Sequence, residues 1–198
     1  CTFLLTSLFV VKDSYDLYRI NAAKSFYGDY DVKYTAYAYT QNKEYTDTYL
    51  DSLSYETPMP YAYKGTFDSL VSTTNFSVYP IRLIEGKYPK SNEVLIHKKY
   101  QNEYKVGDTI KLYSDQKSKE YTISGVYENL NNQLVNYSFY TATNSKKDAM
   151  YVYANLKDKS AIATLPVQDY ELNSDMVVAK YHLNVEYENI FKFLILFM

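Results

Sequence analysis

The stretch Lys105-Val106-Gly107-Asp108-Thr109-Ile110-Lys111-Leu112, together with the returning stretch Tyr121-Thr122-Ile123-Ser124-Gly125-Val126-Tyr127, predicts a β-hairpin. Gly107-Asp108 is a turn signal that opens a strand from Thr109 to Tyr113, and the polar residues 114–119 form the loop. Gly125 lies inside the returning strand, where a glycine indicates a bulge or a close approach between two backbones. A small sheet-rich unit is therefore expected in this part of the chain.

Upstream of the hairpin the apolar residues follow a helical period. Tyr15, Tyr18, Ala22 and Phe26 recur at spacings of three and four, which predicts a helix over Val11 to Tyr27 that Gly28 ends.

Residues 31–40 alternate instead, with Val32, Tyr34, Ala36 and Ala38 on one face, so we expect a half-buried strand. Thr46 or Asp47 can cap a short helix that runs past Leu53 and that the pair Pro58 and Pro60 stops. The first part of the chain is therefore predicted to form a helix, a strand, a second helix and a second strand, in that order.

Downstream of the hairpin, residues 129–149 are polar and irregular, and Met150 to Leu156 alternate as a strand. From Gln168 the chain predicts another strand. An Asn173-Ser174-Asp175 cap then opens a helix, expected over Asp175 to Phe191.

Both ends of the chain are apolar. Residues 2–11 carry no charge, and residues 190–198 carry only Lys192. Each segment is shorter than the roughly 20 residues that span a bilayer as a helix, and we interpret both as truncated membrane helices. Lys12 with Asp13, and Glu186 with Glu188, would mark the membrane–water boundary. Three alternatives are a remnant of a signal peptide, an anchor acylated at Cys1, and buried helices of a soluble core.

Composition excludes several classes of protein. The 198 residues hold 21 Lys and Arg against 23 Asp and Glu, so no excess of positive charge favours nucleic acid as a partner. One cysteine excludes an internal disulfide and a Cys-based zinc site. Tyr occurs 26 times and Trp is absent, a pattern typical of a low-GC bacterium that also suits half-exposed sheet faces.

No catalytic, cofactor-binding or metal-binding residue is predicted. The five glycines never reach the spacing of a phosphate-binding loop, and no nucleophile elbow or zincin motif occurs. The weak candidates that remain are also explained as ordinary surface residues. They are His97 and His182 as imidazoles, Asp29 with Asp31 and Glu186 with Glu188 as carboxylate pairs, and Asn75 and Asn136 as glycosylation sequons.

Four blocks in a fixed order carry a resemblance to a known family. They are residues 83–89 (LIEGKYP), 92–96 (NEVLI), 105–110 (KVGDTI) and 121–127 (YTISGVY). Together they resemble the extracytoplasmic domain of FtsX-like permeases, the MacB-like periplasmic core domain. Relatives usually have a glycine after the last helical turn, where this chain has residues 182–185 (HLNV).

The resemblance implies an α+β fold with a porter-like α/β subdomain and an inserted small sheet-rich subdomain, flanked by truncated transmembrane helices. The implied bounds are 1–11 for the end of a first transmembrane helix, 12–188 for the core domain with an insert at about 66–165, and 189–198 for the start of a second transmembrane helix.

The function that follows is that of an ABC transporter permease subunit, multi-pass in the cell membrane with this segment outside the cytoplasm. It would not be an enzyme and would need no cofactor. The implied partners are a cytoplasmic ABC ATPase, a second permease copy or paralogue, membrane lipid and a peptide, lipoprotein or antibiotic substrate, with no nucleic acid. The long helices would carry the motion of the ATPase to the outer domain, for export, extraction or signalling.

Two other classes of function stay open. A membrane- or lipid-anchored binding or adhesion module would use an exposed tyrosine face, and a secreted enzyme would need a cluster of buried carboxylates around His97.

Overall fold

The structure is a computed structural model that describes residues 2–63, 66–114, 117–131, 137–164 and 170–181. The helices are α1 (Thr2–Tyr27), α2 (Ala36–Gln41), α3 (Lys43–Tyr49), α4 (Ala161–Thr164) and α5 (Ser174–Tyr181), with two short 3-10 turns, η1 (Phe76–Val78) and η2 (Lys98–Tyr100). The strands are β1 (Val32–Thr35), β2 (Leu50–Tyr63), β3 (Thr66–Thr73), β4 (Ile81–Gly86), β5 (Glu93–His97), β6 (Thr109–Ser114), β7 (Lys117–Asn129), β8 (Phe139–Ala142), β9 (Tyr151–Leu156) and β10 (Tyr170–Leu172). This mixture of helix and strand around one large sheet is an α+β fold.

One part of the molecule, which we call the helical half, consists of β1, β9, β10, the first part of β2 and the helices α2 to α5. Its strands lie in the order β10-β1-β9-β2, and all three neighbouring pairs are antiparallel. Helices α2 and α3 connect β1 to β2, and α4 connects β9 to β10. This is the βαββαβ arrangement of ferredoxin-like folds, with the rest of the chain inserted between its second and third strands.

The core of the helical half lies between its sheet and its helices. Val32 of β1 and Ala154 of β9 are fully buried, and they pack with residues of α2, α4 and α5. Because side chains alternate across a strand, the neighbouring residues Lys33 and Tyr153 face the opposite side of the sheet. That opposite face turns toward the inserted strands.

The inserted part, which we call the strand half, consists of β3 to β8 and the second part of β2. Strand β7 is its centre: it pairs with β4 and β6 in antiparallel and with β5 in parallel orientation. Strands β8 and β3 then connect β5 to β2. Ile96, Leu112 and Phe139 are fully buried in its core.

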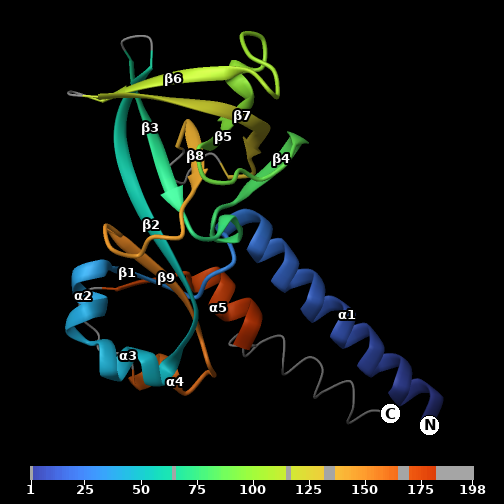
Figure 1. The fold of residues 1–198 in the computed structure, drawn as a ribbon. Helices are drawn as coiled ribbons and strands as arrows, with labels where there is room; N and C mark the ends of the chain where they lie inside the picture. Colours follow the sequence, from blue (N-terminus) through green and yellow to red (C-terminus); the bar gives the residue numbers. More distant parts are fainter. Residues whose placement is uncertain (1, 64–65, 115–116, 132–136, 165–169, 182–198) are drawn as a thin grey trace.

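Strand β2 belongs to both halves and runs the length of the molecule (Figure 1). Its first residues pair with β9 and its last residues pair with β3. Glu56 lies at the change of partner, opposite Tyr151 on one side and Thr73 on the other. The two halves therefore share one continuous strand.

Several predicted elements are confirmed. Strands β6 and β7 form the expected hairpin, and the pairing of β7 with β5 shifts register beside Gly125. A Cβ on Gly125 would lie 2.6 Å from the carbonyl oxygen of Glu85, which is the close backbone approach that the glycine indicated. Helix α1 ends before Gly28, whose φ is +94°.

Two predicted elements are wrong. The strand expected over 31–40 ends at Thr35, because the Thr35 hydroxyl accepts a hydrogen bond from Ala38 N and caps helix α2. The helix expected past Leu53 is α3, which ends at Tyr49, and the residues from Leu50 belong to β2. Pro58 and Pro60 lie inside that strand, opposite Val71 and Ser69 of β3.

The remaining predictions concern the ends and the domain bounds. None of the helices among the described residues combines the length and apolar character needed to cross a bilayer. Helix α5 is described from Ser174 to Tyr181, and the rest of the predicted helix to Phe191 lies outside the described residues. The bounds 1–11, 12–188 and 189–198 stay predictions, as does the insert at about 66–165, a range that also contains β9.

Candidate functional site

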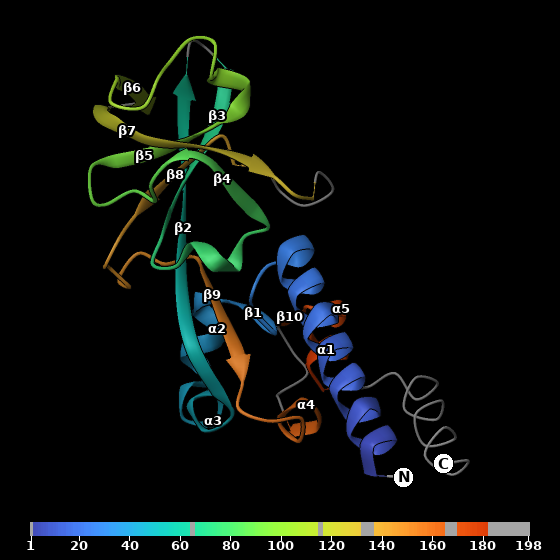
Figure 2. The same cartoon turned by 90° about the vertical axis from the view of Figure 1, so that its right-hand side faces the viewer.

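Helix α1 ends at the junction of the two halves, as the view in Figure 2 shows. Asp29 N donates to Ser77 O of η1 at 2.8 Å, and Asn131 Nδ2 donates to Phe26 O at 3.0 Å. Both partners belong to segments that connect strands of the strand half, Ser77 between β3 and β4 and Asn131 after β7. The last turn of α1 is thus held by the strand half, while the chain continues directly into β1 of the helical half.

Helix α5 begins beside the end of α1. Asn173 caps α5 with its side-chain oxygen on Met176 N, and its amide nitrogen donates to Tyr30 O at 3.0 Å and to Gly28 O at 3.4 Å. From there α5 runs back along α1, with Met176 and Ala179 packed on Ala23. The two helices are therefore antiparallel neighbours.

Asp31 fixes α5 to the sheet of the helical half. Its side chain is fully buried, and its Oδ2 lies 2.7 Å from Lys180 Nζ, 2.8 Å from Leu156 N and 3.1 Å from the hydroxyl of Tyr181. The backbone of Asp31 also bonds to Ala154 O and Asn173 N. One carboxylate thus connects β1, β9 and α5.

A second buried carboxylate joins the two halves. Glu56 of β2 is fully buried, and three tyrosine hydroxyls donate to it: Tyr79 and Tyr153 to Oε2 at 2.6 Å each, and Tyr137 to Oε1 at 2.7 Å. Tyr153 belongs to β9 of the helical half, whereas Tyr79 follows η1 and Tyr137 precedes β8 in the strand half. Hydrogen bonds of this length to an ionised acceptor are among the strong ones in proteins.

These tyrosines stay protonated at ordinary pH. Burial, reinforced by the charge of Glu56, raises the pKa of Tyr79, Tyr137 and Tyr153 well above the usual value near 10. Burial and the charges of Glu171 and Glu56 raise the pKa of Tyr30 to about 12. The phenols therefore act as donors to Glu56 and not as acids or bases.

A cleft of about 390 Å³ opens next to this network. Six of its twelve lining residues are tyrosines, namely Tyr27, Tyr30, Tyr79, Tyr137, Tyr151 and Tyr153. Lys33 and Glu171 are its charged lining residues, and Pro58 and Pro80 also contribute to its walls. The cleft lies between the sheet face of the helical half, the strand half and the end of α1, and we call it the tyrosine cleft.

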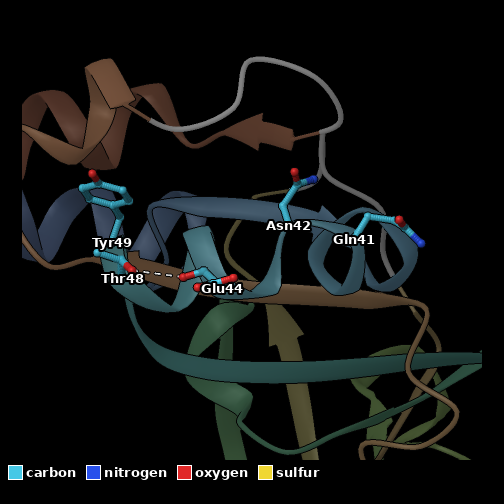
Figure 3. Close-up of a pocket in the computed structure, with 5 residues that line it drawn as sticks. All are labelled: Gln41, Asn42, Glu44, Thr48 and Tyr49. Atoms are coloured by element: carbon cyan, nitrogen blue, oxygen red, sulfur yellow. Dashed lines mark hydrogen bonds between the residues drawn. The ribbon is translucent and has the colours of Figure 1, made fainter.

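A second hollow, of about 450 Å³, lies on α2 and α3 and is shown in Figure 3. It is lined by Gln41, Asn42, Glu44, Thr48 and Tyr49. The Thr48 hydroxyl donates to the backbone oxygen of Glu44, a contact within the helix. Among the lining residues that the structure describes, none is a buried charge or could activate a nucleophile, so the tyrosine cleft is the better candidate site.

The residues that the sequence singled out do not gather into one site. His97 ends β5, and its Nδ1 accepts from Lys99 N; burial and the charges of Lys99 and Lys98 lower its pKa. Asp29 pairs with Lys24 at 3.1 Å, apart from the contacts of Asp31, and Asn75 caps η1. His182, Asn136, Glu186 and Glu188 lie outside the described residues. Among the residues that are described, no three His, Cys, Asp or Glu side chains converge as metal ligands would.

Sequence reasoning missed Glu56, and its expectation that Asp31 is a solvated surface charge is wrong, because the side chain of Asp31 is fully buried. The available signal was an acidic residue flanked by Tyr55 and followed by two prolines, in a stretch that the sequence predicted to be helical. The three tyrosines that bind Glu56 are far apart in the sequence, so only the fold brings them together.

The fold resembles two solved structures. One is a domain of a protein named as a permease from Porphyromonas gingivalis, with 14% identity, a TM-score of 0.39, and a match that covers 67% of this chain and 58% of that one. The other is the extracellular domain of the noncanonic ABC-type transporter YknZ from Gram-positive bacteria, with 11% identity, a TM-score of 0.42, and coverage of 67% and 78%. No protein-family model and no curated protein sequence matches the chain.

Proposed function

We propose that this chain is the extracytoplasmic domain of an ABC transporter permease subunit of the FtsX-like, MacB-like type. Residues 1–11 and 189–198 would belong to its first two transmembrane helices, and residues 12–188 to the domain outside the cytoplasm. The observation that carries the proposal is the antiparallel packing of α1 against the start of α5. A domain inserted between two consecutive membrane helices needs its entry and its exit side by side.

The proposed role is mechanical and not catalytic. A partner ATPase in the cytoplasm would move the membrane helices, and α1 would carry the displacement into the domain as a stiff rod. The contacts of Phe26 O with Asn131 and of Asp29 N with Ser77 O would pass it to the strand half. The contacts of Asp31 with Lys180 and Tyr181 would keep α5 fixed to the helical half.

The remaining partners follow from the same proposal. A second permease copy or paralogue would complete the transporter, with membrane lipid around the helices and a peptide, lipoprotein or antibiotic as the substrate. The four sequence blocks over residues 83–127 and the insertion within a ferredoxin-like half support this assignment.

The test uses the full-length protein in intact cells. Tyr37 is 75% exposed at the helical half, so a Tyr37→Cys variant in which Cys1→Ser removes the native thiol can be labelled with a maleimide that does not cross membranes. We expect labelling without lysis, and co-purification of the full-length protein with a cytoplasmic ATP-hydrolysing subunit. A matched Tyr39→Cys variant, at a buried position, controls for exposure.

Two results would overturn the proposal. Labelling of Tyr37→Cys only after lysis would place the domain inside the cell. The anchored binding or adhesion module would be favoured by two results together. They are labelling from outside without any associated ATPase, and a full-length sequence in which the apolar segments end in polar residues.

A further inference from the structure

The tyrosine cleft carries more negative than positive charge. Lys33 is the cation of its lining and Glu171 the anion, and Glu56 lies directly behind the hydroxyls of Tyr79, Tyr137 and Tyr153. Within the part of the chain that the structure describes, Glu56 forms no ion pair with a lysine or arginine. Its negative charge is therefore balanced only by hydrogen bonds.

The hydrogen bonds to Glu56 also change the rings that line the cleft. A phenol that donates to a carboxylate gains electron density, and the face of an aromatic ring already attracts cations. Three of the six tyrosines are in this state. The ring of Tyr30 stands edge-on to Tyr153 with centroids 4.8 Å apart, which gives the wall two differently oriented ring faces.

Lys33 shows that this wall accommodates an ammonium group. Its Nζ lies 4.2 Å from the ring centroid of Tyr151 and 5.6 Å from that of Tyr153, both within cation–π range. Its ion pair with Glu171 is long, at 3.8 Å, and the Glu171 side chain is 78% exposed, so this pair holds Lys33 weakly. An ammonium group from outside can thus compete with Lys33 for the same rings.

The same features disfavour other ligands. An anion would meet the charges of Glu171 in the lining and of Glu56 behind it. A sugar would find fewer donors than the six tyrosines suggest, because three of their hydroxyls already donate to Glu56. We propose that the tyrosine cleft is a binding site for the ammonium group of a small organic cation. The site is independent of the mechanical role proposed above, since it requires no membrane helix and no ATPase.

The decisive experiment compares two probes of equal shape on the purified chain. Choline carries a quaternary ammonium, and 3,3-dimethyl-1-butanol replaces its nitrogen by carbon. We expect saturable calorimetric binding of choline, at least about tenfold tighter than that of the alcohol, because only choline gains the cation–π contribution.

Three variants locate the binding to the cleft. Tyr151→Leu removes the ring nearest Lys33 and should weaken choline binding about tenfold. Lys33→Met removes the internal competitor and one positive charge, so it should tighten binding severalfold. Tyr37→Leu, at an exposed tyrosine of the same half, should leave the affinity unchanged.

Three outcomes would overturn the proposal. They are no saturable binding of choline, equal binding of the alcohol, and weaker binding after Lys33→Met. The probe comparison and Lys33→Met leave the Glu56 network intact. These two experiments therefore test the proposal even if Tyr151→Leu misfolds.

Discussion

Lys180 Nζ and Asp31 Oδ2 lie 2.7 Å apart although the two residues are 149 positions apart in the sequence. Asp31 precedes the first strand and Lys180 belongs to the last described helix, so this contact closes the helical half. The Asp31 side chain is fully buried, while the Lys180 side chain is 28% exposed. Removal of Lys180 would leave a buried carboxylate without its cation, a situation that is costly in proteins.

We therefore expect Lys180→Met to lower the free energy of unfolding by about 2–4 kcal/mol, somewhat below the usual cost of a fully buried pair because Lys180 is partly exposed. Urea denaturation of the purified chain measures it. The matched control is Lys24→Met, because its partner Asp29 is more exposed than Asp31. This control should lower the free energy of unfolding by less than about 1 kcal/mol. Equal losses in the two variants would contradict a special role for the Asp31 contact.

Tyr153→Phe tests the network that joins the two halves. The substitution keeps the ring and removes a hydroxyl that donates to buried Glu56 at 2.6 Å. We expect the free energy of unfolding to fall by about 1.5–3 kcal/mol, the range for hydrogen bonds to charged groups. Tyr37→Phe, at an exposed hydroxyl, should change it by less than about 0.5 kcal/mol. A loss no larger than that of the control would show that the Glu56 contact contributes little.

Gly28→Ala and Gly107→Ala form a matched pair. Their φ angles are +94° and +98°, so both substitutions impose the same backbone strain, of order 1 kcal/mol. At Gly28 a Cβ would also collide with the carbonyl oxygen of Val78, whereas at Gly107 nothing lies within 4 Å.

Gly28→Ala should consequently lower the melting temperature clearly more than Gly107→Ala, since the end of α1 must move away from η1. Thermal unfolding followed by circular dichroism compares them. Similar shifts would mean that the contact between Gly28 and Val78 relaxes at little cost.

The stability of the protein should fall in alkaline solution. Tyr79 and Tyr153 have a folded pKa well above the unfolded value near 10, so above pH ~10 the unfolded chain loses protons that the folded chain keeps. Their contribution is complete below pH ~10 and declines as pH rises toward the folded pKa, by up to about 1.4 kcal/mol per pH unit for each tyrosine.

Denaturant titrations between about pH 8 and pH 11 measure this slope. Tyr153→Phe should reduce it, because one of the buried phenols that contribute to the slope is then absent. A stability that stays constant above pH ~10 would argue against buried protonated phenols.

Local signals in the sequence were sufficient where neighbours in the chain decide the structure. The hairpin around residues 109–127, the end of α1 at Gly28 and the cap at Asn173 all depend on residues close in sequence. The alternation over 31–40 gave a wrong strand end because Thr35 caps a helix. Val32, Tyr34 and Ala38, which alternation placed on one strand face, are buried although Ala38 belongs to helix α2. The helix expected past Leu53 failed because pairing with β9 extends the chain from Leu50 onward.

The sequence could not predict the candidate site, because the residues that form it are far apart in the chain. Glu56 meets Tyr79, Tyr137 and Tyr153 across sequence separations of 23, 81 and 97 residues. With 26 tyrosines in the chain, no pattern of spacing marks these three. Only the change of partner along β2 brings them to one carboxylate.

The insertion between β2 and β9 has a consequence for the order in which the protein forms during synthesis. Val32 of β1 pairs with Ala154 of β9, so the sheet of the helical half cannot close until more than 120 further residues have left the ribosome. Strands β3 to β8, in contrast, are all made before β9 and pair among themselves. We expect the strand half to fold first and to present the free edge of β2 as the template on which β9, and then β1, complete the other half.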